Sequence, residues 1–103
     1  MLIVLTTFPA LRDAETLAER LVESKLAACV QILPPMTSVY IWEGKVQKES
    51  EHLLLIKTLD EKYDELAAFI AEHHSYEVPE IVAIAAEKVS GPYLDWMHLA
   101  IDD

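Results

Sequence analysis

The chain has 103 residues, of which 52% are apolar and 25% charged, so it is long enough for one hydrophobic core and too apolar for a disordered protein. We therefore expect residues 1–103 to form a single domain. Eight basic against 18 acidic side chains give a net charge of −10, which disfavours nucleic acid and anionic membrane surfaces as partners.

The cysteine content and the N-terminus indicate a cellular location. Cys29 is the only cysteine, so an internal disulfide is excluded. Met1 leads directly into the apolar residues 2–5, without the basic segment and cleavage site of a signal peptide. No apolar stretch reaches the roughly 18 residues of a membrane-spanning helix. These features predict a cytoplasmic protein with no membrane partner.

The first two elements differ in the period of their apolar residues. Residues 2–7 form an apolar, β-branched run and predict a strand that is buried on both faces. From Ala14 to Val22 the apolar side chains recur at helical spacing, with Asp13 as the expected N-cap. We expect an amphipathic helix that packs one side against a sheet.

Strand character returns after this helix. Residues 26–33 and 37–42 predict one long strand, bent at the two prolines between them because proline donates no ladder hydrogen bond. The Glu-Gly pair at residues 43–44 then predicts a tight turn into an antiparallel partner over residues 45–56.

The second half of the chain repeats this plan. Thr58 and Glu61 fit a capping box for a helix with an apolar stripe over residues 63–70. A loop, a fourth strand over residues 81–86 and a short helix from Gly91 follow. The order predicts an α+β fold, the ferredoxin-like βαββαβ sandwich, with a four-stranded antiparallel sheet, both main helices on one face and an extra C-terminal helix.

The predicted sheet has a second face that the two main helices cannot cover. A solvated face requires strands that alternate apolar and polar residues, yet these strands are apolar at both parities. The apolar runs are residues 2–5, 26–30, 53–56 and 81–84. We expect other copies of the chain to cover this face. The alternative is that the C-terminal helix folds over it.

The chain has none of the common catalytic motifs, so we expect no enzyme. Cys29 lies within a strand, either as a small core side chain or as a ligand for a soft metal. The four histidines form no zinc motif. Polar and aromatic side chains gather near strand ends, where we expect them to line a cleft between subunits. They are Tyr40, Trp42, Glu43, Lys57, His74, Tyr76, Glu80, Tyr93 and Trp96.

Six segments carry a family resemblance. They are TTFP at residues 6–9, LAACV at 26–30, SVYIWEGK at 38–45, LIKT at 55–58, HSYEVPEI at 74–81 and YLDW at 93–96. In this order and spacing the series resembles the CutA family of divalent-cation tolerance proteins, over nearly the whole chain. The resemblance implies a ferredoxin-like homotrimer, similarity to PII-type signalling proteins, and a link to copper and other divalent ions.

The resemblance leads to two expected functions. The first is a cytoplasmic, non-enzymatic homotrimer that binds divalent metal, copper first, with His74 as the favoured Cu(II) ligand and Cys29 as a second ligand suited to Cu(I). The alternative is a PII-like signalling protein that binds a small anion or metabolite in the intersubunit cleft, with Lys57 as the positive group. The residues expected in this cleft are Tyr40, Trp42, Lys57, Tyr76, Glu80 and Trp96. A small phosphoryl hydrolase of the same fold is disfavoured, because both arginines, Arg12 and Arg20, fall at the first helix.

Overall fold

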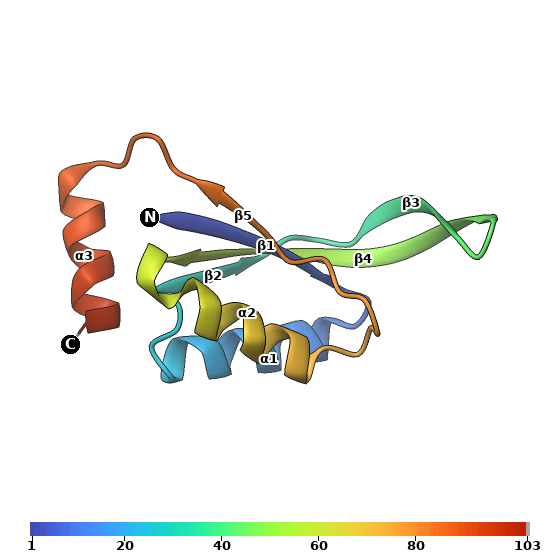
Figure 1. Ribbon diagram of the computed structural model, residues 1–103, viewed down its shortest axis with the longest axis horizontal. Coiled ribbons are helices and arrows are strands. Elements are labelled where there is room, and N and C mark those ends of the chain that lie inside the picture. Colours follow the sequence, from blue (N-terminus) through green and yellow to red (C-terminus); the bar gives the residue numbers. More distant parts are fainter. Residues whose placement is uncertain (103) are drawn as a thin grey trace.

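The computed structural model describes residues 1–102, which form an α+β sandwich with a helix at one end (Figure 1). The elements are β1 (Leu2–Phe8), α1 (Leu11–Glu23), β2 (Cys29–Ile32), β3 (Met36–Trp42), β4 (Lys45–Thr58), a 3-10 turn (Asp60–Lys62), α2 (Tyr63–His73), β5 (Val82–Ala85) and α3 (Gly91–Asp102). Among residues 1–102, no helix is long and apolar enough to cross a membrane.

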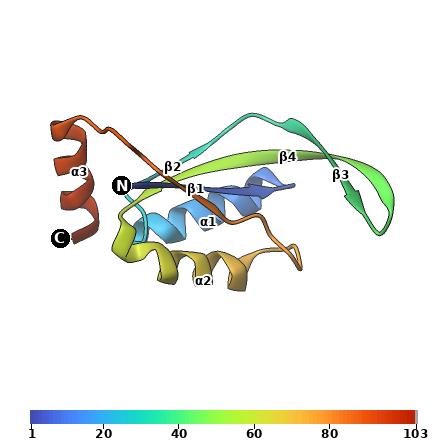
Figure 2. The same cartoon turned by 45° about the horizontal axis from the view of Figure 1, so that its top comes forward.

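The sheet has a four-stranded antiparallel body and a two-stranded extension. In the body the strand order is β2-β4-β1-β5, and β3 pairs with the outer part of β4. Helices α1 and α2 lie together on one face of the body (Figure 2). This is the ferredoxin-like arrangement, so the predicted fold and its extra C-terminal helix are confirmed.

The main core lies between the helices and the sheet. Because β-strand side chains alternate between the two faces, every second residue of β1 and β4 points at the helices. The apolar stripe predicted for the first helix packs against them, as does the buried side of α2. The buried core residues are Val4, Phe8, Ala14, Leu17, Leu21, Leu26, Ala27, Leu54, Ile56, Leu66 and Ile70.

The β3–β4 hairpin forms an arm that projects beyond the helices (Figure 1). It gives the molecule its elongated shape, with extents of 45 × 25 × 23 Å. At its tip Glu43 and Gly44 have φ angles of 51° and 77°, the left-handed pair of a two-residue type I′ turn, and Trp42 pairs with Lys45. The predicted turn is confirmed, and its length fixes the register of the whole arm.

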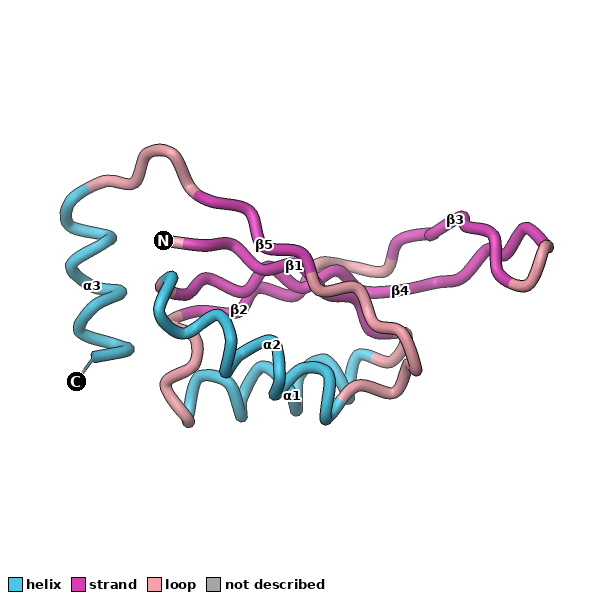
Figure 3. Tube along the Cα trace, in the orientation of Figure 1, coloured by secondary structure: helices cyan, strands magenta, loops and turns pink. Residues whose placement is uncertain are grey.

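The structure corrects the prediction of one long bent strand. The proline segment leaves the sheet between β2 and β3, so two separate strands form (Figure 3). Both pair with β4, which is the only continuous strand of the hairpin. The prolines act as breaks because neither can donate to the ladder.

The two predicted helix caps are also wrong. Ala10 is the N-cap of α1 and makes no side-chain cap, while Asp13 lies in the first turn, where its charge suits the helix dipole. Thr58 remains in β4, and its hydroxyl donates to the carbonyl of Leu26 at 2.7 Å. Glu61 falls in the 3-10 turn that precedes α2. The Thr58 hydroxyl therefore hydrogen-bonds to a buried backbone carbonyl and is not available to cap the helix.

The face of the sheet opposite the helices, here called the open face, is apolar. The strand registers place six large apolar side chains on it: Ile3, Leu5, Leu53, Leu55, Val82 and Ile84. Val82 and Ile84 are 48% and 49% exposed. Helix α3 packs at the end of the sheet instead, through a small core of Ala28, Leu59, Met97 and Ile101. The alternative in which the C-terminal helix covers the open face is therefore wrong within residues 1–102.

Candidate functional site

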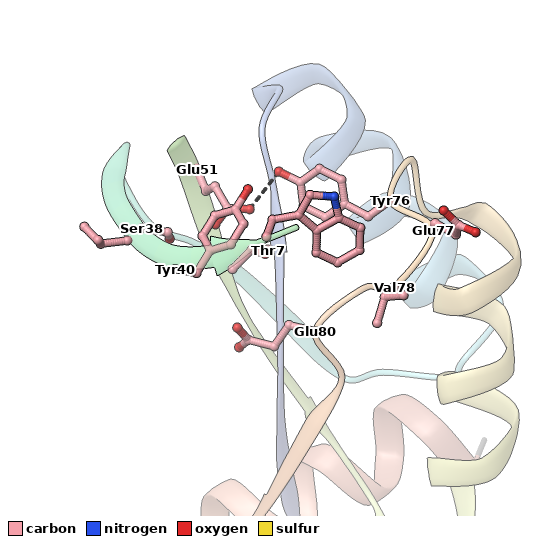
Figure 4. A pocket seen from close by; sticks show the side chains of 10 residues that line it. Thr7, Ser38, Tyr40, Glu51, Tyr76, Glu77, Val78 and Glu80 are labelled. Carbon is pink, nitrogen blue, oxygen red and sulfur yellow. Dashed lines mark hydrogen bonds between the residues drawn. The ribbon is translucent and has the colours of Figure 1, made fainter. Parts of the chain in front are cut away.

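A cleft of about 660 Å³ lies where the β3–β4 arm meets the sheet body (Figure 4). One wall comes from β3 and the outward-facing residues of β1 and β4. The other comes from the loop between α2 and β5. The lining residues are Thr7, Ser38, Val39, Tyr40, Trp42, Glu51, Tyr76, Glu77, Val78 and Glu80. The cleft therefore combines aromatic rings with carboxylates.

Glu51 is the buried carboxylate of this cleft, with 7% of its surface exposed. The Tyr76 hydroxyl donates to its Oε2 atom at 2.8 Å, and Ser38 and Thr7 also hydrogen-bond it. Burial alone would raise the pKa of Glu51, but these hydrogen bonds and the nearby His74 bring the pKa below its ordinary value. Glu51 is therefore ionised at neutral pH and is held by hydroxyl groups.

Tyr76 is the main partner of that carboxylate. Burial raises the pKa of its phenol well above the ordinary value, and the hydrogen bond and negative charge of Glu51 raise it further. The phenol therefore keeps its proton at every physiological pH. It is a permanent hydrogen-bond donor to Glu51.

His74 fixes the loop that carries Tyr76. Its Nδ1 atom accepts a hydrogen bond from the Tyr76 backbone N–H at 2.9 Å, so the proton lies on Nε2, which donates to the Thr7 carbonyl at 2.6 Å. The ring stacks on Phe8, with centroids 4.1 Å apart. Burial lowers the pKa of His74, against the opposing effects of the Thr7 carbonyl and Glu51. The imidazole is therefore neutral with both nitrogens engaged, and it can bind a metal only after one of these bonds breaks.

The residues predicted for one cleft lie in two places. The cleft holds Tyr40, Trp42, Tyr76 and Glu80. Lys57 and Trp96 lie instead at the α3 end of the sheet. The register places Lys57 opposite Ile3, four residues along β1 from Thr7, which corresponds to about 13 Å. Within one chain these two groups do not converge.

Lys57 belongs to an aromatic corner beside α3. Its Nζ atom donates to the Tyr93 hydroxyl at 3.3 Å and lies 5.3 Å from the centre of that ring. Tyr93 in turn packs against Trp96 at 5.5 Å between ring centroids. This corner contains the positive group that the anion-binding alternative requires.

The two predicted metal ligands are also separated. Cys29 is half-buried and pairs with Lys57 on the open face, whereas His74 bonds to Thr7 at the opposite end of β1. They cannot share one ion within a chain. Within residues 1–102 no group of three or more His, Cys, Asp or Glu side chains is close enough to hold a metal ion. A multidentate site therefore requires rearrangement or a second chain.

Sequence reasoning missed six residues of the cleft: Thr7, Ser38, Val39, Glu51, Glu77 and Val78. For Ser38 and Glu51 the two-residue turn at residues 43–44 contained the signal. Counting back from a two-residue turn pairs residue 38 with Glu49 and places Glu51 on the same face as Tyr40. Thr7 pairs with Leu53, which lies two residues from Glu51 on β4, so Thr7 and Glu51 lie on the same face of the sheet.

Comparison with known proteins gives consistent matches. The family model of the CutA1 divalent ion tolerance proteins matches residues 2–100. The divalent-cation tolerance protein CutA of Thermus thermophilus is 44% identical over 96 residues, which is 93% of each chain. Protein CutA of Mus musculus is 41% identical over 92 residues, or 89% of this chain and 52% of the mouse protein. The chain thus spans about half of the mouse relative.

Solved structures agree over nearly the full length. The CutA crystal structure from Xylella fastidiosa has a TM-score of 0.95 at 35% identity, covering 98% of this chain and 97% of the other. The protein from Archaeoglobus fulgidus, described as a periplasmic divalent cation tolerance protein, has a TM-score of 0.94 at 39% identity, covering 98% and 99%. By sequence and by structure, the chain belongs to the CutA1 divalent ion tolerance protein family.

Proposed function

We propose that the protein is a cytoplasmic homotrimer that binds divalent metal ions, copper first, and serves divalent-cation tolerance without catalysing a reaction. The observation that carries the metal proposal is the His74 imidazole, which holds the backbone of Tyr76 in the loop that forms one wall of the acidic cleft. Three carboxylates line the cleft, and imidazole and carboxylate are both common ligands of divalent ions. The single free thiol of Cys29 is compatible with a reducing compartment.

The open face supports the assembly part of the proposal. The arm adds more exposed apolar side chains, on the side that continues the helix-facing residues of β4, where Val39, Ile41 and Val46 are 62%, 71% and 65% exposed. An apolar surface of this kind is typical of an interface, and copies of one chain cover it by closed symmetry. Three copies are the number that the CutA resemblance implies.

The metal ligands are proposed to come from more than one subunit. His74 has an imidazole for Cu(II) and Cys29 has a thiol for Cu(I), but one chain does not bring them together. In the proposed trimer, carboxylates and imidazoles of a neighbouring copy would lie at the borders of the open face. The proposed site is therefore complete only in the assembled protein.

A copper titration of the metal-free protein tests the ligands. We expect His74→Ala to weaken Cu(II) binding measured by calorimetry, by roughly the tenfold that about 1.4 kcal/mol represents. Cys29→Ser should weaken Cu(I) binding measured against a chromogenic chelator. His98→Ala is the matched control, since His98 is exposed on α3 and bonds to Asp102. Unchanged affinity in both ligand variants would contradict the assignment.

Light scattering tests the assembly. A trimer should give three times the chain mass of 11.6 kDa. A monomer at micromolar concentration would contradict the argument from the open face.

The PII-like alternative is favoured only by the aromatic corner. There Lys57 lies against Tyr93 and next to Trp96, so a small anion would have a positive charge and two rings to contact. A Lys57→Met variant that loses binding of a carboxylate metabolite would support this alternative.

A further inference from the structure

We infer that the cleft between the arm and the 74–80 loop binds a small organic cation, a protonated aliphatic amine. The copper proposal refers to the same acidic cleft, but its favoured ligands His74 and Cys29 are not among the lining residues, so amine binding and copper binding can be tested separately. It also differs from the anion-binding alternative, whose positive group lies at the other end of the sheet.

The first reason is the charge of the lining. Glu51, Glu77 and Glu80 line the cleft, and its described lining includes no lysine, arginine or histidine. Glu51 makes no salt bridge within residues 1–102, although it is 7% exposed and ionised. Hydroxyl groups compensate part of the cost of burying that charge, and a cationic ligand would compensate the rest. The cleft therefore attracts cations and repels anions.

The second reason is the aromatic lining, which is independent of the charge. Tyr40, Trp42 and Tyr76 contribute rings, and Tyr40 and Trp42 are 41% and 49% exposed. Aromatic faces stabilise ammonium groups through the negative charge of the ring face, and they also contact alkyl chains. A bare metal ion gains nothing from the alkyl contacts, whereas an alkylammonium ion gains from both.

The third reason is size. A volume of about 660 Å³ lies within the range typical of small-molecule sites and far exceeds the space that one ion occupies. Glu51 comes from β4 and Glu80 from the loop before β5, and Figure 4 shows them at separate positions around the cleft. Two separated carboxylates favour a diamine over a monoamine.

The test is a fluorescence titration with 1,4-diaminobutane. The chain has two tryptophans, so Trp96→Phe leaves Trp42 in the cleft as the only reporter. The buffer is phosphate with a metal chelator, since amine buffers would compete and metal binding must be absent. We expect saturable binding of the diamine, weaker binding of 1-aminobutane, and no binding of butane-1,4-diol or succinate.

Charge variants identify the site. In the same background Glu51→Gln and Glu80→Gln should each weaken diamine binding by roughly tenfold. Glu19→Gln, an equal charge change on the exposed side of α1, should leave it unchanged. Glu80 is exposed, so its variant tests the site even if Glu51→Gln fails to fold.

Several outcomes would overturn the inference: no diamine binding at millimolar concentration, equal binding of the diol, preferred binding of succinate, or equal effects of the cleft and Glu19 variants. None of them bears on copper, because metal is absent throughout. Conversely, loss of copper binding in His74→Ala leaves the diamine result standing.

Discussion

Leu54 and Leu55 are adjacent in β4, and their side chains point to opposite faces of the sheet. Leu54 is fully buried against the helices, whereas Leu55 pairs with Leu5 on the open face. Leu54→Asp loses about 1.5–3 kcal/mol of side-chain burial and adds several kcal/mol for an unpaired buried charge. This sum approaches the whole stability of a small domain, about 5–15 kcal/mol, so we expect this variant to unfold.

Leu55→Asp should behave differently. Leu55 is half-buried in a single chain, so assembly adds roughly 1 kcal/mol of burial per copy. An aspartate there remains solvated in the monomer, but between packed sheets each copy becomes a costly enclosed carboxylate. We therefore expect a folded subunit that no longer assembles.

Light scattering measures the mass of both variants, and circular dichroism with urea measures their folding. Leu54→Ala and Leu55→Ala are the controls, since they shorten the side chain without adding charge. If Leu55→Asp keeps both the mass and the stability of the unmodified protein, the open face is not an interface. If Leu54→Asp folds normally, the core assignment is refuted.

Four further variants test single groups. Thr6→Val should raise the free energy of unfolding by about 1 kcal/mol, because the buried Thr6 hydroxyl has no partner within residues 1–102, whereas Thr58→Val should lower it by about 1–2 kcal/mol; urea titration measures both. Tyr76→Phe should cost about 1.5–3 kcal/mol and raise the pKa of Glu51, so that acid unfolding followed by circular dichroism begins at a higher pH. Because burial lowers the pKa of His74, its contribution is complete above about pH 6.5 and is lost as the pH falls through the folded pKa; urea midpoints measured against pH should show this loss, and His74→Ala should remove it.

The fold was predictable because its signals are repeated along the chain. The apolar stripe from Ala14 to Val22 is a local pattern that specifies an amphipathic helix. The Glu43-Gly44 pair is a local pattern that specifies a two-residue hairpin turn. The helix caps were not predictable in this way. Thr58 has a hydroxyl that suits a cap, but the carbonyl of Leu26, distant in sequence, is the partner that it meets in the fold. Local patterns do not contain such tertiary partners.

The cleft was predictable only in part. Tyr40 and Trp42 lie two residues apart on β3 and therefore share a face, and Tyr76 and Glu80 lie in one loop. Proximity to a strand end says nothing about which end of the sheet a residue occupies. For that reason the sequence pattern predicts Lys57 in the cleft, whereas the register of β1 with β4 places it at the other end of the sheet.

The residues of β4 that point away from the helices include both the polar groups at the two ends of the sheet and the apolar groups of the open face. Along this strand Glu51 lines the cleft, Leu53 and Leu55 belong to the open face, and Lys57 pairs with Cys29 at the far end. Copies that pack on the open face would therefore bring both polar ends to the borders of the interface. If copper ligands come from two chains, the monomeric Leu55→Asp variant should bind copper more weakly than the assembled protein, although its own ligands are intact. Equal affinity, measured by the same calorimetric titration on the folded monomer, would show that one chain supplies the whole site.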